Sequence, residues 1–308
     1  MIEPSAITHA ADRIAPYVRE TPIVRLEPDA FGSSARISLK LESLQHAGSF
    51  KTRGAFNCVL GSDTGQAGVI AASGGNHGLA VAYVAKTLGL RAEIFVPTVS
   101  PAIKVERLRH YGATVNVVGA NYNEALDASR ERAAQTGALE IHAFDHPAIV
   151  AGAGTTGREF EMQAEGLDTV LAGVGGGGFI AGIAAWFAGR VRVIGVEPAA
   201  CPTLHAALAA GHPVEVATSG VASDSLGAKR VGEIAFEVAS CYVERSVLVP
   251  DDAIGLAQRA LWSELRVVAE PGGAAALSAL LCGAYVPEPG ERVGVLVCGG
   301  NADLTRLL

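Results

Sequence analysis

The chain has 308 residues, of which 49% are hydrophobic and 18% charged, and its formal net charge is -7. This composition is typical of a globular α/β protein with a large core, and it excludes a disordered chain. The acidic balance argues against a nucleic-acid partner and against an anionic membrane, because both bind basic faces. Five cysteines without a CxxC pair predict reduced thiols and a cytoplasmic location, and the charged N-terminus shows no signal peptide.

From about residue 66, short β-branched apolar runs alternate with longer helical stretches, which is typical of βαβ units around a largely parallel sheet. We expect Ser100 to cap a helix that runs to His110, and residues 211–230 to form a loop. The expected strands are residues 68–73, 91–97, 113–119, 138–144, 169–174, 191–198, 246–250 and 293–300. The expected helices are 77–89, 101–110, 121–137, about 154–165, 179–189, one ending at 210, 231–240 and one from 251.

The segment 169–189 is uncharged and long enough to span a membrane. Seven of its residues are glycine, four of them consecutive, and such a tetrad would break a helix at its centre. A buried strand, a glycine loop and a helix are therefore expected here.

The first motif with chemical meaning is SFKTRGA, residues 49–55. Ser49 is expected to cap a helix that starts at Phe50, which places Lys51 in the first turn. The positive end of a helix lowers the pKa of an amine, and a neutral lysine is a nucleophile toward an aldehyde. A solvated surface lysine is the alternative for this motif taken alone.

Two glycine-rich turns follow predicted strands. SGGNHG, residues 73–78, can direct several backbone N–H groups at a carboxylate, although an ordinary turn capped by Asn76 has the same pattern. GVGGGGFIAG, residues 173–182, suits a phosphate bound by backbone amides. It also satisfies GxGxxG, with Glu197 about twenty residues further on, so a dinucleotide site is a rival.

The last motif is VLVCGGN, residues 295–301, which brings Cys298 to a turn. A buried structural cysteine is its common alternative role. Taken together and in order over residues 21–301, KLESLQHAGSFKTRGA, SGGNHG, GVGGGGFIAG and VCGGN resemble the fold-type II enzymes that use pyridoxal 5′-phosphate (PLP). Within them they resemble the serine/threonine dehydratase (threonine ammonia-lyase) and serine racemase group.

The resemblance implies an α/β fold of two lobes, similar to the tryptophan synthase β chain, with an open and mostly parallel sheet flanked by helices in each lobe. A smaller mobile lobe is expected over residues 45–145, and a larger PLP-binding lobe over residues 1–44 and 146–308. A homodimer and a small amino-acid substrate are also implied.

The resemblance further assigns roles to residues. Lys51 is implied as the catalytic lysine that bonds to PLP and takes the Cα proton of the substrate. Loss of the β-hydroxyl and then of ammonia would convert serine to pyruvate and threonine to 2-oxobutyrate. The implied cofactor-binding residues are Phe50, Lys51, Asn76, Gly175, Gly176, Gly177, Gly178 and Cys298, and the implied binders of the substrate carboxylate are Ser73, Gly74, Gly75, Asn76 and His77.

A thiol with a reference pKa of about 8.5 is a poor proton donor to the pyridine nitrogen, so Cys298 in this position favours elimination over transamination. Glu270 matches an acidic position near the cofactor, but a solvated carboxylate at a helix end is its alternative.

Three departures from the group matter. Racemases have a serine where this chain has Gly74, so racemisation is expected to be weak or absent. The metal site of the group needs an acid six positions beyond Glu197, where this chain has Thr203. A divalent metal is therefore not expected, and Glu197 can equally be a hydrogen-bonded polar residue at a strand end. Only seven residues follow Asn301, so no regulatory domain is expected.

Three other functions are open. A relative could act on a modified hydroxy amino acid, such as 3-hydroxyaspartate or a derivative of hydroxyectoine. A β-replacement synthase would have the same lysine and phosphate loop, but an aspartate commonly follows that lysine, whereas this chain has Thr52. A protein outside this class, with a Rossmann fold, would bind NAD through the glycine loop.

Overall fold

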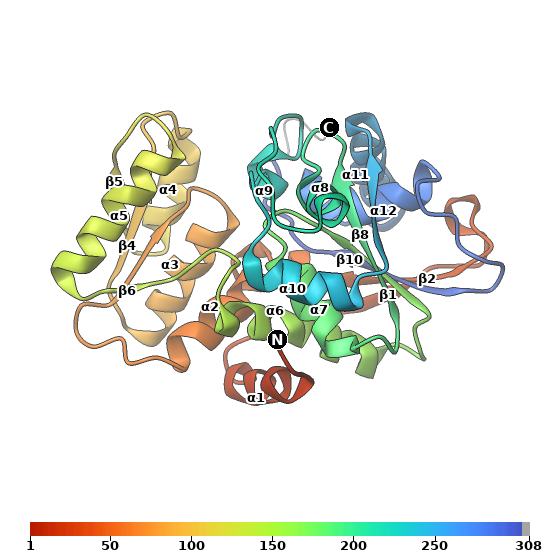
Figure 1. Cartoon of the computed structure of the whole chain (residues 1–308), viewed down its shortest axis with the longest axis horizontal. Coiled ribbons are helices and arrows are strands. Elements are labelled where there is room, and N and C mark those ends of the chain that lie inside the picture. Colours follow the sequence, from red (N-terminus) through yellow and green to blue (C-terminus); the bar gives the residue numbers. More distant parts are fainter. Residues whose placement is uncertain (304–308) are drawn as a thin grey trace.

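The computed structural model describes residues 1–303. Its strands form two separate sheets, a six-stranded one in the order β1-β2-β10-β7-β8-β9 and a four-stranded one in the order β5-β4-β3-β6 (Figure 1). The strands are β1 Ile23–Arg25, β2 Arg36–Leu41, β3 Val69–Ala72, β4 Ala92–Val96, β5 Thr114–Val117, β6 Leu139–Glu140, β7 Thr169–Gly173, β8 Arg192–Pro198, β9 Arg245–Val249 and β10 Arg292–Val297. The α-helices are α1 Pro4–Ile14, α2 Lys51–Leu60, α3 Asn76–Leu88, α4 Ala102–His110, α5 Tyr122–Thr136, α6 Pro147–Gln163, α7 Gly178–Phe187, α8 Thr203–Ala210, α9 Ser223–Leu226, α10 Glu233–Tyr242, α11 Asp251–Leu265 and α12 Pro271–Leu281.

The four-stranded sheet is parallel throughout. Apolar side chains of α2, α3 and α4 cover one face of it, where Val69 and Ala71 of β3 point. The alternate residues Ile70 and Ala72 point to the other face and pack against α5. This alternation follows from the period of two along a strand, and it buries both faces of the sheet.

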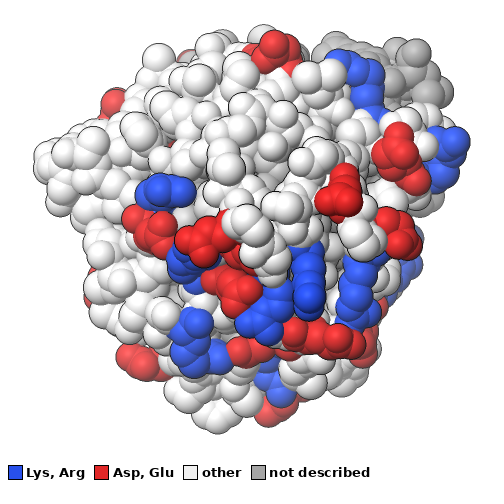
Figure 2. All heavy atoms as spheres, turned by 90° about the vertical axis from the view of Figure 1, so that its right-hand side faces the viewer, with Lys and Arg blue, Asp and Glu red and all other residues white. Residues whose placement is uncertain are grey.

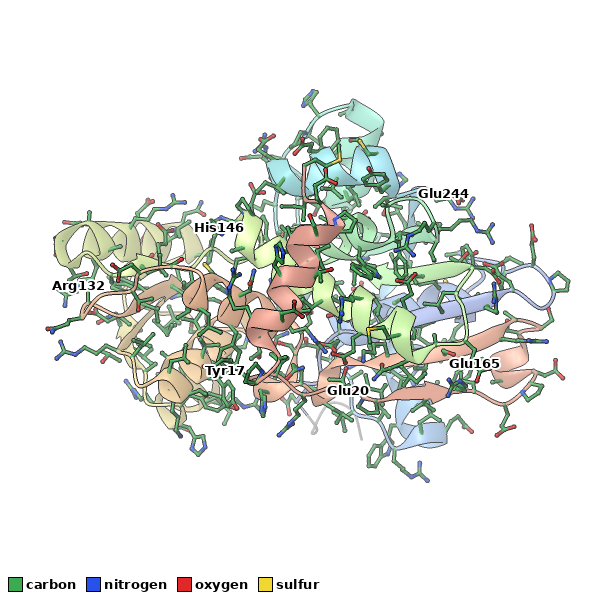
Figure 3. The ribbon with its side chains drawn as sticks, turned by 90° about the horizontal axis from the view of Figure 1, so that it is seen from below. Tyr17, Glu20, Arg132, His146, Glu165 and Glu244 are labelled. Carbon is green, nitrogen blue, oxygen red and sulfur yellow. The ribbon has the colours of Figure 1, made fainter. Side chains whose placement is uncertain are left out.

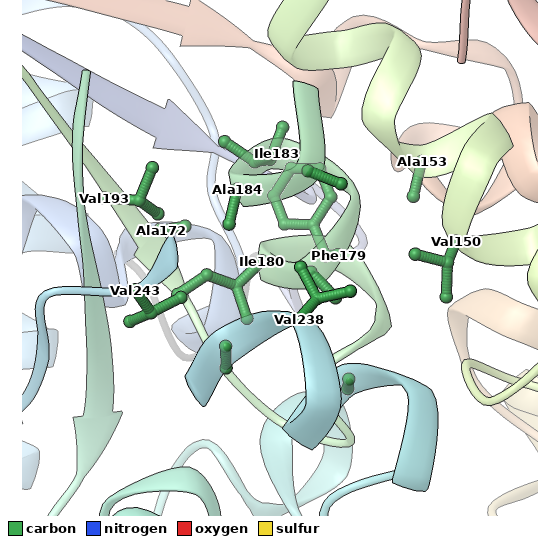
Figure 4. Packing of buried hydrophobic residues seen from close by; sticks show 14 of the residues in the cluster. Val150, Ala153, Ala172, Phe179, Ile180, Ile183, Ala184, Val193, Val238 and Val243 are labelled. Atoms are coloured by element: carbon green, nitrogen blue, oxygen red, sulfur yellow. The ribbon is translucent and has the colours of Figure 1, made fainter. Parts of the chain in front are cut away.

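The six-stranded sheet is parallel except for the edge strand β1, which pairs antiparallel with β2. Helices α1, α6, α7 and α10 cover one face, and α11 and α12 cover the other. Figure 4 shows Phe179, Ile180 and Ile183 of α7 within the first of these cores. Helices α6 and α7 cross so closely that a Cβ on Gly182 would lie 2.4 Å from the Val150 carbonyl oxygen. Glycine is therefore needed at position 182.

The structure confirms the alternation of strands and helices and the division of residues 169–189 into strand, loop and helix. Several details of the prediction were wrong. Helix α6 begins at Pro147 rather than near residue 154, and α9 interrupts the predicted loop at 211–230. The predicted strand 138–144 has only two paired residues, in β6. No side chain caps α4, so Ser100 is not its N-cap.

The two sheets match the predicted two-lobed arrangement. Every strand of the small sheet lies within residues 45–145, and every strand of the large sheet lies outside that range. Figure 3 shows His146 near the middle of the molecule, between Arg132 at one end and Glu165 and Glu244 toward the other. The exact limits of the lobes and the mobility of the smaller one stay predictions.

Charged side chains of both signs are mixed on the face in Figure 2. Ion pairs at the end of the large sheet include Arg292 with Asp168 at 2.6 Å and Arg192 with Glu291 at 2.9 Å. Within residues 1–303, no helix is both long and apolar enough to cross a bilayer.

A buried network of four charges joins α2 to the large sheet. Both guanidinium edges of Arg53 are used: Nε and Nη2 donate to Glu42 at 2.8 Å each, and Nη1 lies 2.9 Å from Glu159. The Nζ of Lys40 donates to Glu159 at 2.5 Å and to the Thr21 carbonyl oxygen at 2.6 Å. Arg53 is 1% exposed, and Lys40 and Glu42 are fully buried, so each charge depends on its partners for stabilisation.

Candidate active site

The sequence motifs meet at the carboxyl ends of parallel strands from both sheets. Residues 73–77 follow β3, the glycine loop 175–178 follows β7, and Cys298 follows β10. Ligands of open α/β sheets bind at this edge, because the loops there face one another. Most residues around these loops are fully buried, whereas Lys51, residues 73–76 and Gly175 and Gly176 are half-buried, so solvent reaches them.

Lys51 lies in the first turn of α2, as predicted, although the helix begins at Lys51 rather than at Phe50, and its Nζ donates to the Ala143 carbonyl oxygen at 2.6 Å. Burial lowers the pKa of Lys51 to about 8, although Cys298 and Glu270 act in the opposite direction. The predicted cap was wrong: the N-cap of α2 is Phe50, and the buried Oγ of Ser49 has no hydrogen-bond partner in the described part of the chain. The lowered pKa therefore has desolvation as its main cause.

The glycine loop has no room for side chains. A Cβ would lie 2.4 Å from the Phe144 ring at Gly176, 2.7 Å from Ala235 at Gly177, and 2.4 Å from the Phe144 carbonyl oxygen at Gly178. Gly177 also has φ +89, which a residue with a side chain rarely adopts. The loop opens α7 at Gly178, so its free N–H groups can bind an anion.

Asn76 lies in a chain of polar side chains. Its Nδ2 donates to Glu270 in a short hydrogen bond, and its Oδ1 accepts from Asn301 Nδ2 at 2.7 Å. Gly299 makes room for this contact, because a Cβ there would lie 2.0 Å from Glu270 Oε1. Asn76 therefore does not cap α3, whose N-cap is Gly75.

Glu270 is buried, which excludes the solvated alternative. Burial raises its pKa to about 7, against the hydrogen bond from Asn76. The carboxyl group of Glu270 can consequently hold a proton near neutral pH, immediately beside the Asn76 amide.

Cys298 and His77 are both buried and both uncharged near neutral pH. Burial, followed by the charge of Glu270, raises the pKa of the Cys298 thiol to about 12. Burial, followed by the charge of Lys51, lowers the pKa of His77 to about 3. The His77 Nε2 lies 2.8 Å from the Ile141 carbonyl oxygen, so it carries the ring proton and donates it.

The segment 142–145 contributes to the site, and the sequence reasoning missed it. His142 Nδ1 accepts from the backbone N–H groups of Phe144 at 3.2 Å and Asp145 at 2.8 Å, which fixes the turn that presents the Ala143 carbonyl to Lys51. The only available signal was the His-Ala-Phe-Asp-His-Pro run before α6, whose Asp and Pro are typical of a turn rather than a strand.

Ser73, Gly74 and Gly75 form the predicted turn before α3, where Ser73 Oγ accepts from the Gly75 N–H at 3.2 Å. Glu197 lies elsewhere, at the end of β8, and accepts from the N–H groups of Leu204 at 2.7 Å and His205 at 2.8 Å. Glu197 is thus a hydrogen-bonded polar residue that satisfies the first turn of α8. Within residues 1–303, no group of three or more His, Cys, Asp or Glu residues could hold a metal ion.

A lysine with a lowered pKa, a side-chain-free anion loop and an uncharged thiol at converging strand ends are typical of an enzyme that bonds an aldehyde cofactor carrying a phosphate. The family model described as "Pyridoxal-phosphate dependent enzyme" matches residues 14–299. The chain belongs to this family of PLP-dependent enzymes.

Known relatives refine the class. The chain is 37% identical to phenylserine dehydratase of Ralstonia pickettii, in a match that covers 97% of this chain and 93% of that protein. It is also 37% identical to an L-threonine ammonia-lyase of Geobacter sulfurreducens, and that match covers 99% of this chain and 77% of the relative. It superposes on maize serine racemase with a TM-score of 0.94, at 31% identity and over 99% and 95% of the two chains. It is thus a PLP-dependent lyase of the serine/threonine dehydratase and serine racemase group, as the motifs indicated.

The residues of this chain fit PLP. The loop at 175–178 packs against Phe144, Ala235 and Leu226 and has no side chains, so no side chain covers the N–H groups at the start of α7, which suits the phosphate. The Lys51 amine can be neutral near pH 8, which suits a bond to an aldehyde. The family match also leaves the NAD-binding alternative without support.

Proposed function

We propose that the protein removes water and then ammonia from L-serine and L-threonine, with Lys51 as the catalytic residue. The observation that carries this proposal is the half-buried Lys51 amine, whose pKa is lowered to about 8. The loops at 73–77 and 175–178 and the turn at Cys298 converge at the same edge of the sheets. The names of the relatives support a β-hydroxy amino acid as the substrate, since they act on phenylserine, threonine and serine.

Bound PLP supplies an electron sink that stabilises negative charge at the substrate Cα. We assign the phosphate to the backbone N–H groups of Gly175, Gly176, Gly177 and Gly178, and one ring face to Phe50, which stacks on Phe179 with 3.9 Å between centroids. The Cys298 thiol is placed against the ring nitrogen, and with a pKa of about 12 it keeps its own proton. The Asn76 amide, held by Glu270, is placed against the ring oxygen.

The substrate is then held by the turn before α3. We assign residues 73–77 to its carboxylate, because the first N–H groups of a helix have no partner within the helix. The Ser73 N–H already donates to the Phe95 carbonyl oxygen and the Gly75 N–H to Ser73 Oγ, so the N–H groups of Gly74, Asn76 and His77 are the ones proposed to bind it. In this position the Cα proton faces Lys51, whose Nζ accepts it near pH 8. Neutral His77 adds no charge to the site and does not compete for that proton.

The experiment is a visible spectrum of the purified protein, before and after addition of L-serine or L-threonine, with the 2-oxo acid followed by coupled reduction. We expect a cofactor band that shifts, together with pyruvate or 2-oxobutyrate. A cofactor band without oxo acid would contradict the dehydratase proposal. Addition of sulfide with O-acetylserine then detects β-replacement, and 3-hydroxyaspartate detects a modified substrate.

The pKa of Lys51 predicts how fast the apoenzyme captures PLP. Only the neutral amine attacks the aldehyde, so the second-order rate should rise about tenfold per pH unit below about pH 8 and level off above it. Stopped-flow absorbance between pH 6 and pH 10, values we choose to bracket that pKa, measures this. A rate that keeps rising toward the ordinary lysine value of 10.5 would show that the pKa is not lowered.

Gly74 is expected to limit racemisation. A Cβ at this position would lie 3.6 Å from Val96 and 3.7 Å from Ser100, so a serine fits without strain. Gly74→Ser should add a base on the face opposite Lys51, and D-serine should form from L-serine on chiral chromatography. A folded, active variant that forms no D-serine would contradict this role, and Gly74→Ala is the matched control.

We further propose a cytoplasmic homodimer that needs no divalent metal, with residues 45–145 as a mobile lobe. Activity that survives chelation with EDTA and a dimer mass by light scattering are the expected results. The hydrogen bonds that Glu197 already accepts support the metal-independent reaction.

A further inference from the structure

An ion pair links the two sheet layers beside the site. Lys104 of α4 and Asp224 of α9 lie 3.0 Å apart, between Nζ and Oδ2. Helix α4 follows β4 of the small sheet, and α9 follows β8 of the large sheet. The Asp224 side chain is 83% exposed and that of Lys104 is 30% exposed, so both charges are accessible to solvent.

Helix α9 contacts the two loops to which the phosphate and the substrate carboxylate are assigned, and it also contacts the start of α12. Its Leu226 lies against the glycine loop, because a Cβ on Gly175 would be 3.0 Å from the Leu226 Cα. The Oγ of Ser225 accepts from the Gly272 N–H at 3.1 Å, at the start of α12. The Asp224 carbonyl oxygen lies 3.7 Å from where a Gly75 Cβ would be. Figure 1 shows α9 on the side of the large sheet that faces the small sheet.

Both charges also act on the interior of the site. After burial and the hydrogen bond from Asn76, the next influences on the pKa of Glu270 are Lys104, which lowers it, and Asp224, which raises it. The pair is therefore within electrostatic range of the Asn76 and Glu270 contact. The two effects oppose each other, so the intact pair adds little net charge beside this contact.

We propose that the Lys104 and Asp224 pair determines specificity, by selecting substrates with a neutral β-substituent over those with a second carboxylate. A neutral substituent leaves the pair intact. A second carboxylate meets the more exposed charge of Asp224, and to reach Lys104 it must displace that residue. This inference rests on the proposed function and names the class of side chain that the same site accepts.

The test compares Asp224→Asn and Lys104→Met with the wild-type enzyme loaded with PLP. The measured quantity is kcat/KM for L-threo-3-hydroxyaspartate divided by kcat/KM for L-serine. Asp224→Asn leaves Lys104 unpaired and should raise this ratio on the order of fivefold, whereas Lys104→Met leaves Asp224 unpaired and should lower it by a similar factor. Both changes should shrink at high salt, because exposed charges are screened.

Asp127→Asn is the matched control, since it removes the same charge from an exposed position on α5 and should leave the ratio unchanged. Ratios that stay at the control value in both variants, or that move in the same direction, would overturn the inference. Calorimetric affinities for L-aspartate and L-alanine, which carry no β-leaving group, give the same comparison without turnover. If the wild type converts neither hydroxy amino acid, the proposed function fails, and the ratio of these affinities still decides the inference.

Discussion

Replacement of Lys51 by alanine should lower kcat for L-serine and L-threonine by about a hundredfold to ten-thousandfold, which is the usual cost of losing a positioned acid–base group. Within the described residues, His77 and Lys104 are poor substitutes, because the His77 ring is neutral and donates to the Ile141 carbonyl oxygen, and Lys104 is paired with Asp224. The measurement is oxo-acid formation by the variant after saturation with PLP.

Lys86→Ala is the matched control for this variant, because Lys86 is exposed on α3. Circular dichroism and the melting temperature should show that both variants are folded. Wild-type turnover by a folded Lys51→Ala enzyme would remove Lys51 from the mechanism and would require a different lysine for the cofactor.

Loss of Arg53 should be the most damaging change to stability. Arg53→Ala leaves Glu42 buried without its bidentate partner and removes one of the two cations beside Glu159, which costs about 3–5 kcal/mol of the free energy of unfolding. Urea unfolding followed by circular dichroism measures this cost. Arg53→Lys keeps the charge but loses the planar fork of hydrogen-bond donors, so its stability should lie between that of the wild type and that of Arg53→Ala.

Two further variants separate the causes. Arg107→Ala, at an exposed position on α4, should change the free energy of unfolding by no more than about 0.5 kcal/mol. The double variant Arg53→Leu with Glu42→Leu removes one charge of each sign, so it should recover much of the loss. A double variant as unstable as Arg53→Ala alone would show that shape, rather than an unpaired charge, is responsible.

The sequence was sufficient for features that depend on local order. Glycine runs after apolar strands located the loops at 73–78 and 175–178, because strand, turn and helix are each specified by neighbouring residues. A parallel sheet then brings such loops to one edge, which is why separate motifs could be assigned to one site.

Contacts between distant residues could not be predicted in this way. Asn76 and Glu270 are 194 residues apart, and Lys51 and Ala143 are 92 apart. Neither pair has a pattern in the sequence, and the reason for a glycine at 299 becomes clear only once the Glu270 carboxylate is placed beside it. Ser49 shows the opposite error, since a residue type that often caps helices makes no capping hydrogen bond here, and the helix begins one residue later, with Phe50 as its N-cap.

The route of the chain between the sheets has a mechanical consequence. Within residues 1–303 the backbone passes between the two sheets twice, after β2 toward α2 and after β6 toward α6, and these passages contain Lys51 and Ala143. A rotation of the small sheet relative to the large one would therefore have its axis close to Lys51. Such a rotation would move Lys51 little but would change the distance between Lys104 of α4 and Asp224 of α9.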